Sequence, residues 1–294
     1  QAWTYDRGGN TATIGYPICF AGTCPGSGTT PRTTSYTVTN GYLTAIPGWA
    51  NSISYQLNGM LNTTAYANNI SQVVVNDPNS IPRPQDIQYK VTSTGALIGS
   101  LGPYEYDSSG NIKKLNGLDF TYDLVSRLKS GAVNVVGVPK TFTANYDGYG
   151  NITSLNHNGL GRSTPTSVTS NRLTSGSYDA GGNLIALGFA AYGYDRLNMP
   201  TQICSSGTLT ACSGENWLFA YTADDERILE YRVGGGAFRT TLRDLNGKAL
   251  REYFVEAGSN WSVFQDYIYR DSTLLASVHP TEGTRFFGPD HLGT

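Results

Sequence analysis

The side chains best suited to chemistry in this chain of 294 residues are four cysteines and three histidines. The cysteines form two local pairs, Cys19 with Cys24 and Cys204 with Cys212, each in a loop rich in Gly, Ser and Thr. Their separations do not match the spacing of zinc ligands, and no histidine lies close in sequence to either pair. Four cysteines allow three disulfide connectivities. We favour the two local ones, which are typical of an exported protein.

The histidines give little support for catalysis. His157 lies in the polar turn 156–159, and His279 precedes a proline at the end of an expected strand. His291 follows Asp290, a pair that could act as a general base, but a hydrogen-bonding pair at a strand turn is the simpler interpretation. The sequence has no nucleophile elbow, phosphate loop or metal-ligand cluster. We therefore predict a protein that is not an enzyme and has no cofactor or metal.

These residues lie between copies of one repeated element. Residues 106–112 and 178–184 both read Tyr-Asp-x-x-Gly-Asn followed by Ile or Leu, and in each a second Tyr-Asp follows sixteen positions after the first. Residues 146–152 are a third copy, and 5–10 are a fourth copy of the opening. Residues 53–61 form a degenerate copy with Asn-Gly as its turn. Such an internal repeat determines the fold.

Each copy predicts a β-hairpin. Gly adopts positive φ at little steric cost, and Asp and Asn form hydrogen bonds with their own backbone in turns. The neighbouring runs, such as 151–155, lack helical spacing. We expect the Tyr to pack across the neighbouring strand and the Asp to cap the turn. The residues expected to hold the repeats together are Tyr5, Asp6, Tyr106, Asp107, Gly110, Asn111, Tyr122, Asp123, Tyr146, Asp147, Gly150, Asn151, Tyr178, Asp179, Gly182, Asn183, Tyr194 and Asp195.

These copies, together with Tyr-Asp-x-x-x-Arg-Leu at 122–128, resemble the tyrosine-aspartate (YD) repeats of the Rhs family. The C-terminal third, through 243–253 and the Asp-His-Leu-Gly of 290–293, is similar to the approach to the Rhs-associated core. The resemblance implies a sheet that coils into a hollow shell around a cargo polypeptide, often a C-terminal toxin. Some family members cleave themselves at aspartates beyond this core, and no such residue can be carried over to this sequence.

Composition fits turn-rich β structure and argues against two classes of partner. The chain has 35 Gly and 20 Tyr, and its net charge of −2 with no basic run gives no attraction to nucleic acid or anionic membranes. No apolar run approaches the roughly 20 residues of a membrane span. The chain begins at Gln1 without a signal peptide, as expected for a processed or incomplete product.

A proline-rich stretch at 76–88 indicates a rigid extended connection and an internal boundary. We therefore divide the chain into two regions. Residues 1–88 are a degenerate repeat region that contains the first cysteine loop. Residues 89–294 are a YD-repeat sheet that runs into the start of the Rhs-associated core.

The sequence thus predicts an all-β fold, a repeat-built curved sheet of successive β-hairpins, solenoid-like or shell-like, with little helix. The expected function is that of a secreted or cell-surface structural scaffold. It would be a shell segment that encloses a toxin-like cargo, or a unit that assembles end to end into filaments through unpaired strand edges.

The alternative function is that of a glycan-binding or cell-contact adhesin, because aromatic and Asn side chains on a β surface can stack on sugars. The family resemblance also extends to proteins described as carbohydrate-binding. Trp49 and Trp261 lie outside the repeat frame and are the candidate glycan contacts.

Overall fold

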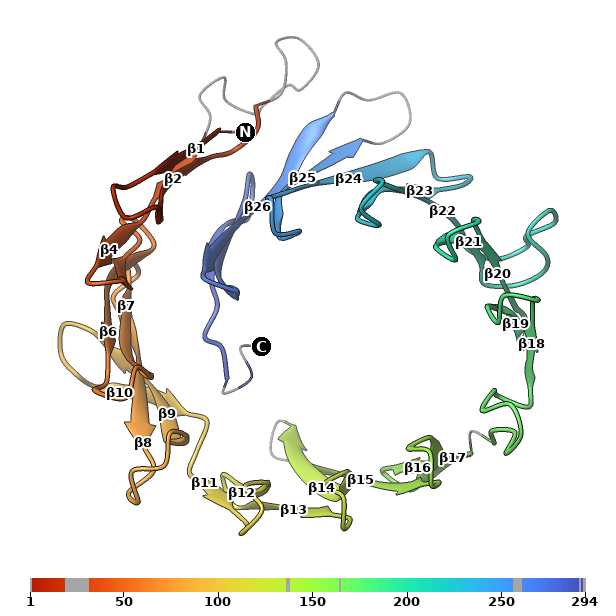
Figure 1. Cartoon of the computed structure of the whole chain (residues 1–294), viewed down its shortest axis with the longest axis horizontal. Coiled ribbons are helices and arrows are strands. Elements are labelled where there is room, and N and C mark those ends of the chain that lie inside the picture. Colours follow the sequence, from red (N-terminus) through yellow and green to blue (C-terminus); the bar gives the residue numbers. More distant parts are fainter. Residues whose placement is uncertain are drawn as a thin grey trace. The chain divides into compact units, whose positions relative to one another are not determined.

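The computed structural model describes residues 2–18, 32–135, 138–163, 165–255, 261–290 and 292. Within these ranges all regular structure is β-strand, in 28 strands without a helix, which confirms the predicted all-β fold (Figure 1). The described residues therefore include no helix able to span a membrane. The chain forms two compact units.

The first unit comprises Gln1–Ile53, Tyr66–Asn68 and Gly176–Thr294. It contains a three-stranded, a two-stranded and an eleven-stranded sheet, and in each sheet the strands lie in chain order. The small sheets are β1 (Ala2–Tyr5), β2 (Thr11–Gly15) and β3 (Thr33–Ser35), and β4 (Thr37–Thr39) and β5 (Tyr42–Ala45). The large sheet is β18 (Gly176–Tyr178), β19 (Leu184–Leu187), β20 (Ala190–Tyr194), β21 (Pro200–Cys204), β22 (Asn216–Tyr221), β23 (Arg227–Arg232), β24 (Ala237–Arg243), β25 (Ala249–Val255), β26 (Ser262–Arg270), β27 (Thr273–His279) and β28 (Gly283–Phe286).

The second unit comprises Ser54–Ala65 and Asn69–Ser175. Its strands also follow chain order, in a seven-stranded sheet and in most of a five-stranded sheet whose first strand, β6, lies mainly in the first unit. The five-stranded sheet is β6 (Ala50–Tyr55), β7 (Leu61–Tyr66), β8 (Ile70–Asn76), β9 (Pro84–Val91) and β10 (Leu97–Ser100). The seven-stranded sheet is β11 (Tyr104–Tyr106), β12 (Ile112–Leu115), β13 (Leu118–Tyr122), β14 (Leu128–Val135), β15 (Val138–Tyr146), β16 (Ile152–His157) and β17 (Leu160–Ser163).

Strand order places the repeat turns on one side of each sheet, where the strands end. Because each strand pairs antiparallel with the next one in the chain, successive connections alternate between the two ends of the strands. The turns that follow β11, β13 and β15 therefore lie at the same end of the strands in the seven-stranded sheet. The turns that follow β18, β20, β22, β24 and β26 likewise lie at one end of the strands in the eleven-stranded sheet.

The seven-stranded sheet and the first strands of the eleven-stranded sheet have very few buried residues. Within the described part of residues 105–203, Gly131 and Ala144 alone are buried. A two-layered domain of ordinary design would bury one face of each strand against a second layer. Backbone pairing and contacts between neighbouring strands must therefore stabilise this stretch.

A true core forms within the first unit, where its N-terminal strands meet β25–β28. Ile46, Ile268 and Leu275 are fully buried. The Tyr16 hydroxyl donates to the carbonyl oxygen of Tyr267 at 2.6 Å, which joins segments 251 residues apart. Local repeat packing is supplemented here by contacts between distant segments.

The proline-rich stretch 76–88 is a hairpin rather than an extended connection. β8 and β9 pair from Ile70↔Val91 to Asn76↔Pro84, so the prolines lie in the turn and at the first position of β9. A strand's first position tolerates the missing N–H of proline. Residue 88 lies inside β9, and the division into 1–88 and 89–294 stays a prediction.

Candidate functional site

Each complete repeat contains a five-residue turn that begins at its Asp, which we call an Asp turn. In the turn 107–111, one carboxylate oxygen of Asp107 accepts the backbone N–H groups of Ser109 and Asn111, both at 2.9 Å. The other oxygen accepts the side-chain amide of Asn111 at 3.0 Å. The fourth residue, Gly110, has a φ of 88°, which glycine adopts most readily. The repeat motif therefore supplies the residues that satisfy this turn.

The Asp-turn carboxylates are stabilised in their charged form. Hydrogen bonds from the Asn side chain at the fifth position, and then from backbone N–H groups, hold the pKa of Asp107, Asp147 and Asp179 below its ordinary value. In the turn of Asp123 the backbone N–H of Arg127 is the largest cause of the lowered pKa, and the guanidinium bonds the second oxygen at 2.6 Å. The Asp turns begin at Asp6, Asp107, Asp123, Asp147, Asp179, Asp195 and Asp244.

The repeat tyrosines connect each Asp turn to the preceding one. The Tyr146 hydroxyl donates to the carbonyl oxygen of Leu128 at 2.7 Å, and Leu128 is the residue that follows the preceding Asp turn. The same bond joins Tyr106 to Pro84 (2.7 Å), Tyr122 to Ile112 (2.9 Å), Tyr194 to Leu184 (3.1 Å) and Tyr221 to Pro200 (2.8 Å). Tyr5 is exposed and Tyr178 is half-buried, at the ends of β1 and β18. The hydroxyls of Tyr122, Tyr146, Tyr194 and Tyr221 therefore bind the backbone of the strand before their own, and that of Tyr106 binds β9.

Neighbouring Asp turns also bond to each other directly. The Asn111 side chain donates to the hydroxyl of Ser126 at 3.1 Å, and Asn183 donates to the side-chain oxygen of Asn198 at 2.8 Å. Ser126 and Asn198 have φ values of 62° and 63°, so each occupies the fourth position of its turn, where Gly110 lies in the turn before. In both pairs, the Asn at the fifth position of one Asp turn thus donates to the side chain at the fourth position of the next Asp turn.

The repeat motif does not identify two further turns of this kind. At 222–226 the Thr222 hydroxyl replaces the carboxylate and accepts the N–H groups of Asp224 and Glu226 at 3.3 and 3.2 Å. At 244–248 an Arg replaces the Tyr before Asp244. In both turns the residue three positions after the acceptor side chain, Asp225 or Gly247, has a positive φ. An acceptor side chain followed three positions later by Gly, Asn or Asp is therefore the sequence signal that would find them.

A buried ion cluster joins the two ends of the first unit. Asp266, 2% exposed, accepts bonds from Arg251 at 2.5 and 2.8 Å and from Arg32 at 2.6 Å. Arg251 and Tyr253 also donate to the carbonyl oxygen of Pro17. The cluster satisfies charges that would be costly to bury singly. No local sequence pattern predicts it.

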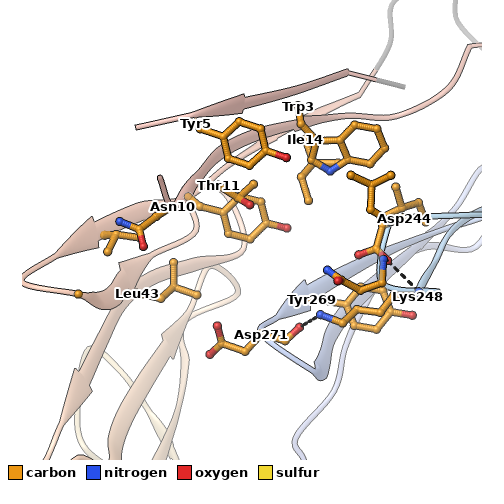
Figure 2. A pocket seen from close by; sticks show the side chains of 16 residues that line it. Trp3, Tyr5, Asn10, Thr11, Ile14, Leu43, Asp244, Lys248, Tyr269 and Asp271 are labelled. Atoms are coloured by element: carbon orange, nitrogen blue, oxygen red, sulfur yellow. Dashed lines mark hydrogen bonds between the residues drawn. The ribbon is translucent and has the colours of Figure 1, made fainter. Parts of the chain in front are cut away.

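A pocket of about 320 Å³ lies in the first unit (Figure 2). Trp3 and Tyr5 form one side, and Asp244, Lys248 and Tyr269 form the other. Sequence patterns do not predict this pocket, because the residues on its two sides lie more than two hundred positions apart in the chain.

The second pair of cysteines forms the expected disulfide. Cys204 and Cys212 are bonded at 2.03 Å in the loop between β21 and β22, and Cys204 is fully buried. Cys19 and Cys24 lie outside the described residues. Their pairing stays a prediction that peptide mapping without reduction would check.

The tryptophans chosen as glycan contacts make contacts within the chain. The Trp49 ring lies 6.4 Å from that of Phe286 and beneath the Arg32 guanidinium at 5.5 Å. The Trp261 ring lies 6.4 Å from that of Phe238. Neither tryptophan lines the pocket described above.

The described histidines have no surroundings that indicate catalysis. His157 is exposed at the end of β16. In the turn after β27, Nδ1 of His279 accepts the N–H groups of Thr281 and Glu282 at 3.3 and 3.2 Å. His291 lies outside the described residues. In the part of the chain that the structure describes, no group of three or more His, Cys, Asp or Glu residues could hold a metal ion.

Comparison with solved structures shows a shared fold. A mutant Tc holotoxin pore from Photorhabdus luminescens aligns with 99% of this chain at 15% identity and a TM-score of 0.75. The crystal structure of TcdB2-TccC3 aligns with 99% at 14% identity and a TM-score of 0.71. The crystal structure of the same complex without its hypervariable C-terminal region aligns with 99% of this chain at 14% identity and a TM-score of 0.67. This chain covers 16%, 17% and 16% of those chains, respectively.

Sequence comparisons give no further relatives. No protein-family model matches the chain, and no curated protein matches its sequence. The resemblance to the solved chains is therefore a resemblance of fold.

Proposed function

We propose that this chain is a structural segment of a β-sheet shell that encloses a polypeptide cargo, with no enzymatic activity of its own. The strands of residues 105–203, which belong to two sheets, carry the proposal. A stretch that buries two of its described residues fits a wall better than a self-contained domain. The fold shared with Tc toxin chains supports the same role, because one of those complexes has a hypervariable C-terminal region that its structure omits.

The same observations support an assignment to the YD-repeat proteins of the Rhs family, with 243–294 as the approach to the Rhs-associated core. The first support is that the Asp and Tyr of the repeat motif form the same hydrogen bonds in successive copies. The second support is the fold shared with the Tc toxin chains. The chain covers about a sixth of the matched chains, which fits one section of a larger wall.

A secreted or cell-surface location belongs to this proposal. The Cys204–Cys212 disulfide supports it, since such bonds persist in oxidising compartments and are rare in the cytosol. The partners would be a cargo polypeptide or further copies of the sheet, paired through strand edges.

The proposal is tested by fusing a disordered polypeptide after Thr294 and measuring its rate of digestion by a protease. We expect slower digestion than for the same polypeptide fused to a globular domain of equal size. The variant that carries Tyr122→Phe, Tyr146→Phe and Tyr194→Phe loses three bonds between strands, and we expect it to protect the cargo less. Equal digestion rates in all fusions would contradict an enclosing role.

The adhesin alternative predicts a different result. A glycan array would then show sugar-specific binding that Trp49→Ala or Trp261→Ala removes. Because both rings make contacts within the chain, we expect these changes to lower stability and the array to remain blank.

A further inference from the structure

The pocket of the first unit contains two carboxylates that have no ionic partner among the described residues. One oxygen of Asp244 accepts the N–H groups of Asn246 and Lys248 at 2.8 and 2.9 Å, and the other has no hydrogen bond among the described residues. The Asp271 carboxylate has neither a hydrogen bond nor an ion pair within those residues. Lys248, the one cation among the described residues that line the pocket, donates instead to the backbone carbonyl of Asp271 at 2.5 Å. The described charged groups of the lining therefore sum to −1.

Aromatic rings line the same pocket. Trp3 and Tyr5 from β1 lie opposite Tyr269 from β26 (Figure 2). Tyr36 also lines the pocket. Burial, and then the Asp244 and Asp271 carboxylates, raise the pKa of Tyr36 to about 12, so both acids act on the same hydroxyl. The Lys248 ammonium lies 5.8 Å from the centre of the Tyr269 ring, which shows that a cation is accommodated against this wall.

We propose that this pocket binds an organic cation, an alkylammonium or a guanidinium group, between its aromatic rings and the carboxylates of Asp244 and Asp271. Aromatic faces attract such cations. A hard metal ion would require six or more oxygen ligands, and the described lining of the pocket offers two carboxylates, with no group of three or more acidic, His or Cys residues. The volume of about 320 Å³ is at the lower end of the usual range for small-ligand pockets.

The test uses the complete 294-residue chain at constant ionic strength. Tetramethylammonium chloride and methylguanidinium chloride are titrated while tryptophan fluorescence and calorimetry are recorded, with sodium chloride as the blank and methyl glucoside as a neutral competitor. We expect saturable binding of the organic cations that sodium does not reproduce and methyl glucoside does not displace.

Two conservative variants isolate the carboxylates. Asp244→Asn retains the oxygen that accepts the turn's N–H groups, and Asp271→Asn suits a residue whose φ is 50°. Each should weaken binding roughly fivefold to thirtyfold. Asp195→Asn is the matched control. Asp195 accepts the two corresponding N–H groups, those of Leu197 and Met199, in an Asp turn that does not line the pocket. Circular dichroism establishes that all three variants are folded.

Two further ligands distinguish the source of the cation. Tighter binding of a capped lysine or arginine peptide than of choline assigns the site to a side chain of a polypeptide, and the reverse order assigns it to a small amine. Either order supports the proposal. Absence of saturable binding, displacement by methyl glucoside, or an equal loss in Asp195→Asn would each overturn it.

Discussion

Among single residues, the Asp-turn carboxylates hold their hydrogen bonds best in the charged form. In every Asp turn except that of Asp179, one carboxylate oxygen accepts two backbone N–H groups, and in most turns the side chain at the fifth position bonds the other oxygen. A neutral carboxylic acid offers weaker acceptors and adds a proton that has no acceptor in the turn. The stability of the repeats should therefore depend on pH.

We predict that the folded chain loses stability in acid. The pKa values of Asp6, Asp107, Asp123, Asp147 and Asp179 are lowered in the folded state. As the pH falls through about 4, the unfolded chain takes up protons first, so the free energy of unfolding decreases. Urea midpoints should be constant from about pH 7 to about pH 5 and then decline. The triple variant Asp107→Asn, Asp147→Asn, Asp179→Asn should be less stable at pH 7 and less sensitive to acid. An unchanged acid response would contradict this account.

The buried cluster gives a second prediction for a single residue. Asp266→Asn leaves the charges of Arg251 and Arg32 unpaired, and breaking such a pair typically costs about 3–5 kcal/mol. Glu282→Gln is the control, because it removes an exposed ion pair with Arg285 and should change stability by less than about 0.5 kcal/mol. Chemical denaturation of both variants measures the difference. Similar losses would show that the cluster contributes little.

Among the strands, the tyrosine hydroxyls bind the backbone of one hairpin to the next. Tyr146→Phe removes the bond to the Leu128 carbonyl and preserves the ring, so we expect a loss of about 1 kcal/mol. Tyr149→Phe is the matched change two residues into the following turn, where the side chain is 74% exposed, and should be neutral. Thermal unfolding of the two variants compares them. A destabilised Tyr149→Phe variant would show that removal of any hydroxyl is harmful.

The sequence predicts these hairpins because their requirements are local. Gly110 and Asn111 satisfy a turn that closes within five residues, so a short motif is enough to locate it. Thr222 fulfils the same role with a hydroxyl and thus escapes a motif written with Asp. The contacts of Asp266 with Arg32 span 234 residues, and no spacing rule encodes them. The pocket is missed for the same reason, because Trp3 and Tyr269 meet only after folding.

For the whole molecule, we expect the end strands to govern association. β28 is the last strand of its sheet, and the Phe287 N–H bonds inward to Leu275. Since N–H groups alternate in direction along a strand, that of Thr284 points to the unpaired edge. We expect the isolated chain to associate at micromolar concentrations, and Thr284→Pro to reduce that association by removing the outward N–H. Light scattering and electron microscopy measure both. A stable monomer of the unaltered chain would contradict this expectation.

The scarcity of buried residues between 105 and 203 also affects cooperativity. Where each hairpin is coupled mainly to its neighbours, unfolding free energy approaches a sum of local terms, and one hairpin can open while the core around Ile268 and Leu275 stays closed. Amide protons of β13–β16 should then exchange with solvent faster than those of β26 and β27, as hydrogen-exchange mass spectrometry would record. A wall built in this way could open at one hairpin and let an extended polypeptide pass while the remaining strands keep their pairing.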